Sequence, residues 1–186
     1  METQKAIQQR ASLKSLVSDK AIEPEKVRQV VEAGRLAPST GNCQPWRFIV
    51  VNDRNTVKKV VNESFNLSVN AAAGEAPVLL VVLANPAEGK TSNNRDYTSF
   101  DVGMAVENML LAATDLGLVT HLMTNLNPGA LKKLLGVPDD IDFVVATPLA
   151  YPTASVEAAV KERRSSRPHK ELKDIVYWNR WGKAAG

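Results

Sequence analysis

The sequence predicts one globular domain in which helices cover both faces of a central sheet. The chain has 186 residues, about the size of a single domain. Hydrophobic residues make up 44% of it and charged residues 23%, close to the averages of folded proteins. Helical and strand-like patterns alternate along the chain, which is typical of layered folds. We therefore expect a single three-layer α/β/α domain over residues 1–186.

Helical patterns are separated by prolines and glycines. Residues 3–17 carry an approximate apolar stripe. Pro24 is tolerated in the first turn of the next helix, and Pro38 ends it. The longest pattern, 96–116, is apolar on most sides and is followed by Gly117, a natural C-cap. Such a helix is buried in a core or in a subunit interface. The other expected helices span 54–64, 127–135 and 170–178.

Strand patterns occur between these helices. Residues 46–52 form a β-branched and aromatic run, and 78–84 form the clearest central strand. Further strands are expected at 119–124 and 142–149, whereas the polar residues 86–95 indicate a loop. The segment 151–186 has too little apolar surface to fold by itself. We expect it to lie along another surface, such as a second subunit.

Cysteine content and hydropathy indicate the compartment. A single cysteine, Cys43, cannot form an internal disulfide and favours a reducing environment. The N-terminus lacks the apolar stretch of a signal peptide. The longest apolar run, 76–84, is far shorter than the roughly 20 residues of a membrane span. We expect a cytoplasmic protein without a membrane partner.

Charge is unevenly distributed along the chain. The net charge is +3, but residues 161–170 alone hold five Lys or Arg and one Glu. The remainder of the chain is therefore slightly acidic, which suits binding of one anion better than binding of a long nucleic acid. We expect no nucleic-acid partner.

Three polar clusters are candidates for a binding site. Arg10 and Lys14 are expected four residues apart on one helical face, with Ser12 between them, and a bound anion would relieve their repulsion. Residues 37–46 form a proline-locked loop rich in hydrogen-bonding groups, which can hold a ligand rigidly. The third cluster is the basic segment 161–170. Taken singly, each is also explained as a solvated helix face, an ordinary turn or a soluble tail.

Several other kinds of site are disfavoured. The sequence has neither a Walker loop nor a GxGxxG motif. His121, His169 and Cys43 are too few for a familiar zinc cluster, so no metal is expected. Cys43 has no activating base nearby in the sequence, so a cysteine hydrolase is not expected either.

Taken together, the clusters resemble the nitroreductase family of flavoproteins, in family order and across nearly the whole chain. The most specific match is Ala37–Phe48 (APSTGNCQPWRF), which is similar to the family's Ala-Pro-Ser-x-x-Asn-x-Gln-Pro-Trp-x-Phe loop. The other matches are Arg10-x-Ser12-x-Lys14, Asp101-x-Gly103-x-Ala105-x-x-Asn108-x-x-Leu111, Gly117-Leu118, Ala150-Tyr151-Pro152 and Leu172–Trp178.

The resemblance implies an α+β fold with a central, largely antiparallel sheet between helical layers. It also implies a homodimer that exchanges terminal segments, with residues 151–186 wrapping the partner, and two FMN molecules at the interface. The phosphate and ribityl end of FMN would be bound by Arg10, Ser12 and Lys14, with Arg167 and His169 (or Lys170 in its place) closing from the tail.

The resemblance also assigns residues to the flavin ring. Pro38, Ser39, Thr40 and Asn42 of the partner subunit would lie against the ring. Asn70 would reach its pyrimidine edge, and the backbone at Thr124 and Asn125 would face flavin N5.

The implied activity is ping-pong transfer of two electrons from NAD(P)H to a small acceptor such as a nitroaromatic or quinone. The flavin carries this chemistry, so no side chain is assigned as catalytic. The alternative is an FMN-binding protein without reductase turnover, such as a sensor or a flavin-modifying relative.

Overall fold

A three-stranded antiparallel sheet lies at the centre of the computed structural model, which describes residues 2–15 and 17–182. Its order is β1 (Trp46–Val51), β2 (Val78–Ala84) and β5 (Asp142–Leu149), with both pairings antiparallel. β2 is buried along its whole length, which explains its uninterrupted apolar sequence. The predicted limits of β2 and β5 are confirmed, and β1 ends one residue earlier than predicted.

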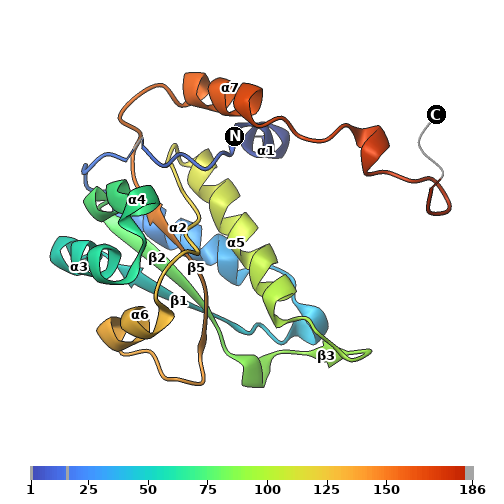
Figure 1. Cartoon of the computed structure of the whole chain (residues 1–186), viewed down its shortest axis with the longest axis horizontal. Helices are drawn as coiled ribbons and strands as arrows, with labels where there is room; N and C mark the ends of the chain where they lie inside the picture. Colours follow the sequence, from blue (N-terminus) through green and yellow to red (C-terminus); the bar gives the residue numbers. More distant parts are fainter. Residues whose placement is uncertain (1, 16, 183–186) are drawn as a thin grey trace.

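Helices cover both faces of this sheet (Figure 1). On one face, α2 (Pro24–Arg35) and α5 (Thr98–Asp115) pack over the Leu80 side of β2. On the other face, α3 (Arg54–Ser64) packs over its Leu79 side. α6 (Pro128–Leu135) joins that second core through Leu131. The three-layer α+β architecture is confirmed.

The N-terminal helix is much shorter than predicted. α1 spans Thr3–Gln9, not residues 3–17. The chain then becomes extended, and Ser12 forms a parallel bridge with Thr120 while the Leu13 amide donates to the Thr120 carbonyl at 3.0 Å. Leu13 is buried by this pairing, so a long-range contact prevails over helix propensity. The prediction that Arg10 and Lys14 share a helical face is therefore wrong.

Residues 119–124 make isolated bridges rather than the predicted regular strand. Val119 and Met123 bridge antiparallel to Ala150 and Ala146, and Thr120 bridges parallel to Ser12. The predicted loop 86–95 contains a short hairpin, β3 (Thr91–Ser92) with β4 (Arg95–Asp96). Several smaller elements were not predicted. They are α4 (Leu67–Asn70) and the 3-10 turns η1 (Thr40–Asn42), η2 (Ala71–Glu75) and η3 (Pro86–Glu88).

The C-terminal part differs most from the prediction. Helix α7 (Val156–Ser166) was not predicted, and the predicted helix 170–178 is only the single 3-10 turn η4 (Leu172–Asp174). α7 buries just Val160, so its apolar periodicity is weak. Beyond it the chain projects away from the body (Figure 1).

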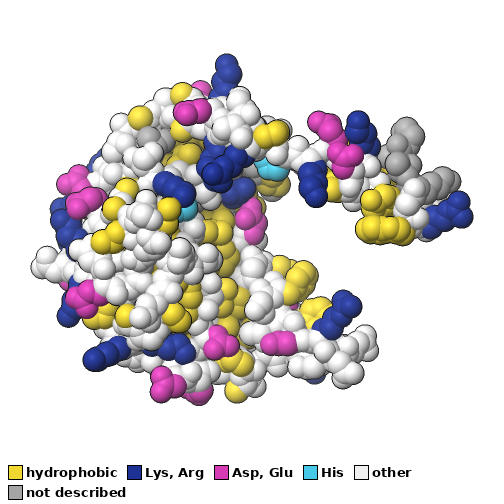
Figure 2. Space-filling model, viewed as in Figure 1, with side chains coloured by type: hydrophobic (Ala, Val, Ile, Leu, Met, Phe, Trp, Pro, Cys, Tyr) yellow, Lys and Arg dark blue, Asp and Glu magenta, His cyan; other side chains and the backbone are white. Residues whose placement is uncertain are grey.

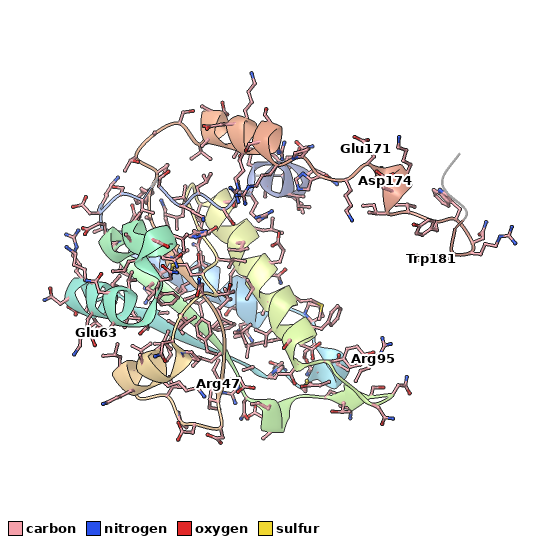
Figure 3. The ribbon with its side chains drawn as sticks, in the orientation of Figure 1. Arg47, Glu63, Arg95, Glu171, Asp174 and Trp181 are labelled. Carbon is pink, nitrogen blue, oxygen red and sulfur yellow. The ribbon has the colours of Figure 1, made fainter. Side chains whose placement is uncertain are left out.

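Figure 3 places Glu171, Asp174 and Trp181 along this projecting segment, well separated from the sheet. Its large apolar side chains are exposed, with Leu172 72% and Trp181 87% accessible. Among residues 2–15 and 17–182, no helix combines the length and the apolar character needed to cross a bilayer.

Candidate functional site

Helix α7 and the segment after α1 enclose a cavity of about 240 Å³, here called the cationic cavity. Its polar lining brings together both ends of the chain: Arg10, Ser12, Arg163, Arg164, Arg167 and His169. Four of these were predicted from the sequence to meet at one anion. Figure 2 shows Lys and Arg side chains gathered where α1 and α7 meet.

Local structure explains how the arginines converge. Arg163 and Arg164 lie in the last turn of α7 and Arg167 is its C-cap, where cations complement the helix dipole. The Arg164 guanidinium donates a hydrogen bond to the Gln8 carbonyl, which ties α7 to α1. Arg10 follows α1 directly, and its Nε lies 3.4 Å from the Glu107 carboxylate of α5.

Lys14 lies beside the cationic cavity rather than in its lining. It is exposed, and with Arg163 it lies close enough to act on His121. Burial, followed by the charges of Lys14 and Arg163, lowers the pKa of His121 to about 4. The imidazole is therefore neutral at neutral pH, and its buried Nδ1 has no hydrogen-bond partner within the described parts of the chain.

The loop from Pro38 to Asn42 is held by the first turns of α5. The Asp101 carboxylate is fully buried and accepts from both the Thr40 amide and the Thr40 hydroxyl, each at 3.0 Å. The Ser39 hydroxyl accepts from the Gln44 amide at 3.0 Å. Pro38 and Asn42 remain exposed. Asp101 thus fixes the loop on its inner side, while Pro38 and Asn42 remain accessible on its outer side.

Cys43 contacts the same Asp101 carboxylate, and its thiol has low reactivity. Its thiol donates to the Asp101 carboxylate at 3.5 Å. Burial, together with that hydrogen bond and the negative charge of Asp101, raises the pKa of the Cys43 thiol. A protonated thiol is a poor nucleophile, which agrees with the sequence-based argument against a cysteine hydrolase.

The remaining predicted residues lie on two adjacent segments. Asn70 is buried, and its side-chain amide donates to the Asn66 carbonyl at 3.1 Å. The Asn66 amide in turn donates to the Asn125 carbonyl at 3.2 Å. Thr124 lines a separate cavity of about 490 Å³ between the start of α5 and α6.

Within one chain, the predicted residues thus form three groups rather than one pocket. The cationic cavity does not include the loop 38–42 in its lining. Arg163 and Arg164 were identified from the sequence only as members of the candidate basic segment 161–170 and were not assigned to the anion with Arg167. His121 lies outside this lining, and its position near Lys14 and Arg163 had no local signal, because these neighbours come from distant parts of the chain.

Comparison with known proteins gives a consistent result. The nitroreductase family pattern matches residues 7–68 and 58–151. An Archaeoglobus fulgidus protein named "Putative NADH dehydrogenase/NAD(P)H nitroreductase" is 36% identical over 156 residues, covering 81% of this chain and 86% of that protein.

Solved structures agree with the sequence match. A nitroreductase family protein from Clostridium novyi NT is 28% identical with a TM-score of 0.76, over 99% of this chain and 97% of its own. A Desulfovibrio desulfuricans protein, described as "a putative nitroreductase in complex with fmn", is 27% identical with a TM-score of 0.70, over 83% of this chain and 88% of its own. This chain therefore belongs to the nitroreductase family.

Proposed function

We propose that this chain is an FMN-dependent oxidoreductase that transfers electrons from NAD(P)H to a small acceptor, such as a nitroaromatic or a quinone. The observation that carries the proposal is the convergence of Arg10 and Arg167, from opposite ends of the chain, on one cavity that also contains the Ser12 side chain. The FMN bound by the Desulfovibrio relative and the NAD(P)H named for the Archaeoglobus relative support the choice of cofactor and donor.

The donor set of the cationic cavity fits a flavin phosphate. A phosphate monoester carries roughly −1.5 to −2 charges near neutral pH. Arginines bind it through charge-assisted, often bidentate hydrogen bonds. The Ser12 hydroxyl is a further donor, and the backbone bridge between Ser12 and Thr120 fixes its position. His169 lines the same cavity. Lys14, which lies outside this lining, would reach the ribityl end of bound FMN.

Bound FMN would supply two-electron redox chemistry, in a ping-pong cycle in which the oxidised nucleotide leaves before the acceptor enters. The residues of the chain would bind and orient the cofactor. The arginines would hold the phosphate. Pro38, Ser39, Thr40 and Asn42 of the loop would lie against the ring of a second subunit's flavin, and Asn70 and the backbone at Thr124 and Asn125 would border the ring. No side chain has to act as a general acid or base, because water can supply the protons.

A homodimer would complete this site. The loop 38–42 does not line the cationic cavity within one chain, and two subunits that each contribute one of them would bring both to one flavin. The projecting segment after α7 exposes Trp178 and Trp181, and Figure 2 shows a hollow beside it with hydrophobic side chains on its wall. A second copy of the chain, wrapped by residues 151–186, would cover both surfaces.

The oligomeric state can be measured by sedimentation velocity. We expect the full chain to sediment as a dimer and Trp178→Ala/Trp181→Ala to shift it towards monomer. Lys173→Ala, a change on the same segment that keeps the apolar side chains, serves as the control. A monomeric full chain would contradict the dimer.

The activity has a direct spectroscopic test. Protein loaded with FMN should lose its yellow colour on anaerobic addition of NADH or NADPH and regain it when a quinone or nitroaromatic is added. If the flavin stays oxidised in excess of both nucleotides, the reductase proposal is wrong. Binding of FMN without steady-state NAD(P)H oxidation would instead identify a flavin-binding protein without turnover.

A further inference from the structure

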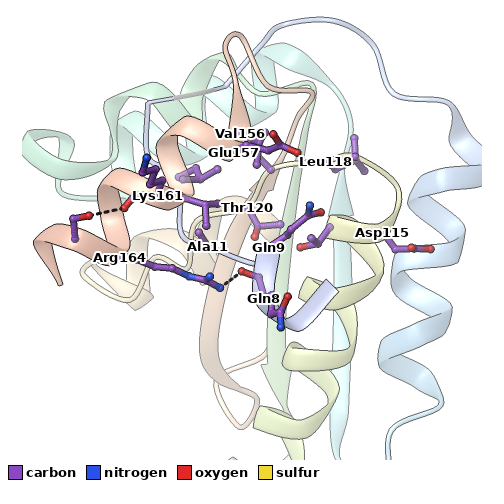
Figure 4. Close-up of a pocket in the computed structure, with 16 residues that line it drawn as sticks. Gln8, Gln9, Ala11, Asp115, Leu118, Thr120, Val156, Glu157, Lys161 and Arg164 are labelled. Carbon is purple, nitrogen blue, oxygen red and sulfur yellow. Dashed lines mark hydrogen bonds between the residues drawn. The ribbon is translucent and has the colours of Figure 1, made fainter. Parts of the chain in front are cut away.

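The loop after α2 stands apart from the cavities beneath α7. A cavity of about 750 Å³ lies under that helix (Figure 4) and shares Ala11, Val160 and Arg164 with the cationic cavity. No residue of 38–44 lines either cavity. What the loop offers a ligand on its outer side therefore depends on its support by Asp101 and on contacts within the loop itself.

Gln44, at the end of this loop, has a backbone conformation that its side chain disfavours. Its φ is +50°, in the left-handed region, close to Gly41 at +61° and Asn42 at +58°. Glycine adopts such angles freely and asparagine tolerates them, whereas glutamine is strained there. Pro45 follows directly, and a residue before proline favours an extended backbone. Strain of this kind is concentrated at functional sites, and the contacts of the Gln44 side chain indicate its role.

The Gln44 side chain is hydrogen-bonded to Asn42. Its Nε2 donates to the Asn42 Oδ1 at 3.1 Å and to the Asn42 carbonyl oxygen at 3.3 Å. Because Gln44 occupies the side-chain oxygen of Asn42, the Nδ2 group is the part left to bind a ligand. Within residues 2–15 and 17–182 no other group hydrogen-bonds to this Nδ2, and Asn42 is exposed.

An Asn42 side chain held in this way acts as a hydrogen-bond donor. A flavin ring presents carbonyl oxygens as acceptors, and at neutral pH the ring carries more negative charge when reduced than when oxidised. A donor that is fixed before the ligand arrives stabilises such added charge with little reorganisation. Hydrogen bonds to charged groups are also stronger than those to neutral groups. The arrangement therefore suits the reduced ring better than the oxidised ring.

We infer that Gln44 is a positioning residue, which holds Asn42 as a hydrogen-bond donor to a ring carbonyl of the FMN bound by a second subunit and thereby favours the reduced flavin. This inference rests on the proposed function, because it takes the loop 38–42 as a contact of that ring. Gln44 acts through Asn42, and the hydrogen bonds change no covalent bond.

Two affinities measure this effect. Titration calorimetry of the flavin-free full chain with oxidised FMN, and anaerobically with dithionite-reduced FMN, gives their ratio. Gln44→Gly removes the side chain, keeps the amide contact to the Ser39 hydroxyl and adopts the positive φ without strain, so we expect it to fold.

The expected change is selective for the reduced form. Gln44→Gly should lower the preference for reduced FMN about tenfold and leave the affinity for oxidised FMN within about threefold. Gln44→Met, similar in length but without a donor, should do the same. Gln29→Met, a matched change at an exposed position of α2, should leave both affinities unchanged.

A double variant separates positioning from a general structural role. Asn42→Ala should itself lower the preference for reduced FMN, and adding Gln44→Gly should cause no further decrease. Equal losses for both forms of FMN, a further decrease in the double variant, or a change confined to the KM of the acceptor overturns this inference and leaves the proposed function standing. Failure of the unmodified chain to bind either form of FMN overturns both.

Discussion

The Asp101 carboxylate accepts hydrogen bonds from the amide and the hydroxyl of Thr40, so one buried acid fixes the loop that begins at Pro38. Asp101 has no solvent exposure and lies in the first turns of α5. Glu107, six residues further along α5, contacts Arg10 of the cationic cavity. α5 thus contacts both candidate binding regions: Asp101 holds the loop, and Glu107 pairs with Arg10.

Removal of the Asp101 carboxylate should destabilise the fold. Asp101→Ala leaves the Thr40 amide and hydroxyl without their charged acceptor, and hydrogen bonds to charged groups contribute about 1.5–3 kcal/mol each. We expect a loss of about 3–6 kcal/mol in the free energy of unfolding, measured by urea denaturation. Thr40→Val keeps the amide contact and should cost about half as much, about 1.5–3 kcal/mol. Equal losses in the two variants would contradict this role for Asp101.

Loss of Arg10 should weaken FMN binding. Removing one charge-assisted contact to a phosphate costs about 1.5–3 kcal/mol, or roughly ten- to a hundred-fold in affinity. Arg10→Ala is compared with Arg28→Ala, whose guanidinium pairs with Glu25 on the exposed face of α2. Fluorescence titration with FMN measures both. Unchanged affinity in Arg10→Ala would remove Arg10 from the site.

His121 should make stability depend on pH. Its folded-state pKa of about 4 lies below the ordinary value of 6.5. Between these values the unfolded chain binds more protons than the folded chain. The contribution to stability is therefore complete above pH 6.5 and is lost as the pH falls towards 4.

His121→Gln lacks this titration. Between about pH 7 and about pH 4.5, its free energy of unfolding should fall less than that of the unmodified, flavin-free chain. His169→Gln, which changes the other histidine, should retain the dependence. Parallel pH profiles for the unmodified chain and His121→Gln would show that His121 is not the titrating group.

Gly89 should not tolerate a side chain. A Cβ at this position would overlap the Thr98 hydroxyl and lie 3.2 Å from the Pro86 carbonyl oxygen. Gly89→Ala should cost about 1–3 kcal/mol through overpacking, measured by thermal and urea denaturation. Thr98→Ala removes the overlapping atom, so the double variant should be more stable than the sum of the two single changes implies. Strict additivity would mean that the clash is relieved elsewhere.

The sheet could be predicted from the sequence because its signals are local. The run Val78–Ala84 is continuously apolar and ends at Asn85-Pro86, so its type and both ends follow from adjacent residues. The limits of α3 are likewise set locally, by the Asp53 side chain that accepts from the Thr56 amide. Elements of this kind can be predicted from adjacent residues alone, without the rest of the structure.

Other features depend on contacts that no local pattern shows. α1 ends early because Leu13 is buried beside Thr120. α7 has a single buried residue, Val160, so its periodicity was too weak to indicate a helix. The basic segment 161–170 was a candidate cluster, but the positions of its Arg163 and Arg164 depend on that helix. The convergence of Arg10 and Arg167 was predicted only through the family resemblance.

The sparse attachment of α7 has an evolutionary consequence. A helix that touches the body through Val160, the partly buried Val156 and Ala159 and the Arg164–Gln8 hydrogen bond can change elsewhere along its length without disturbing the sheet. Related chains can therefore diversify here at little risk to folding. Ligand preference would then evolve at the periphery, while the interior stays under constant constraint.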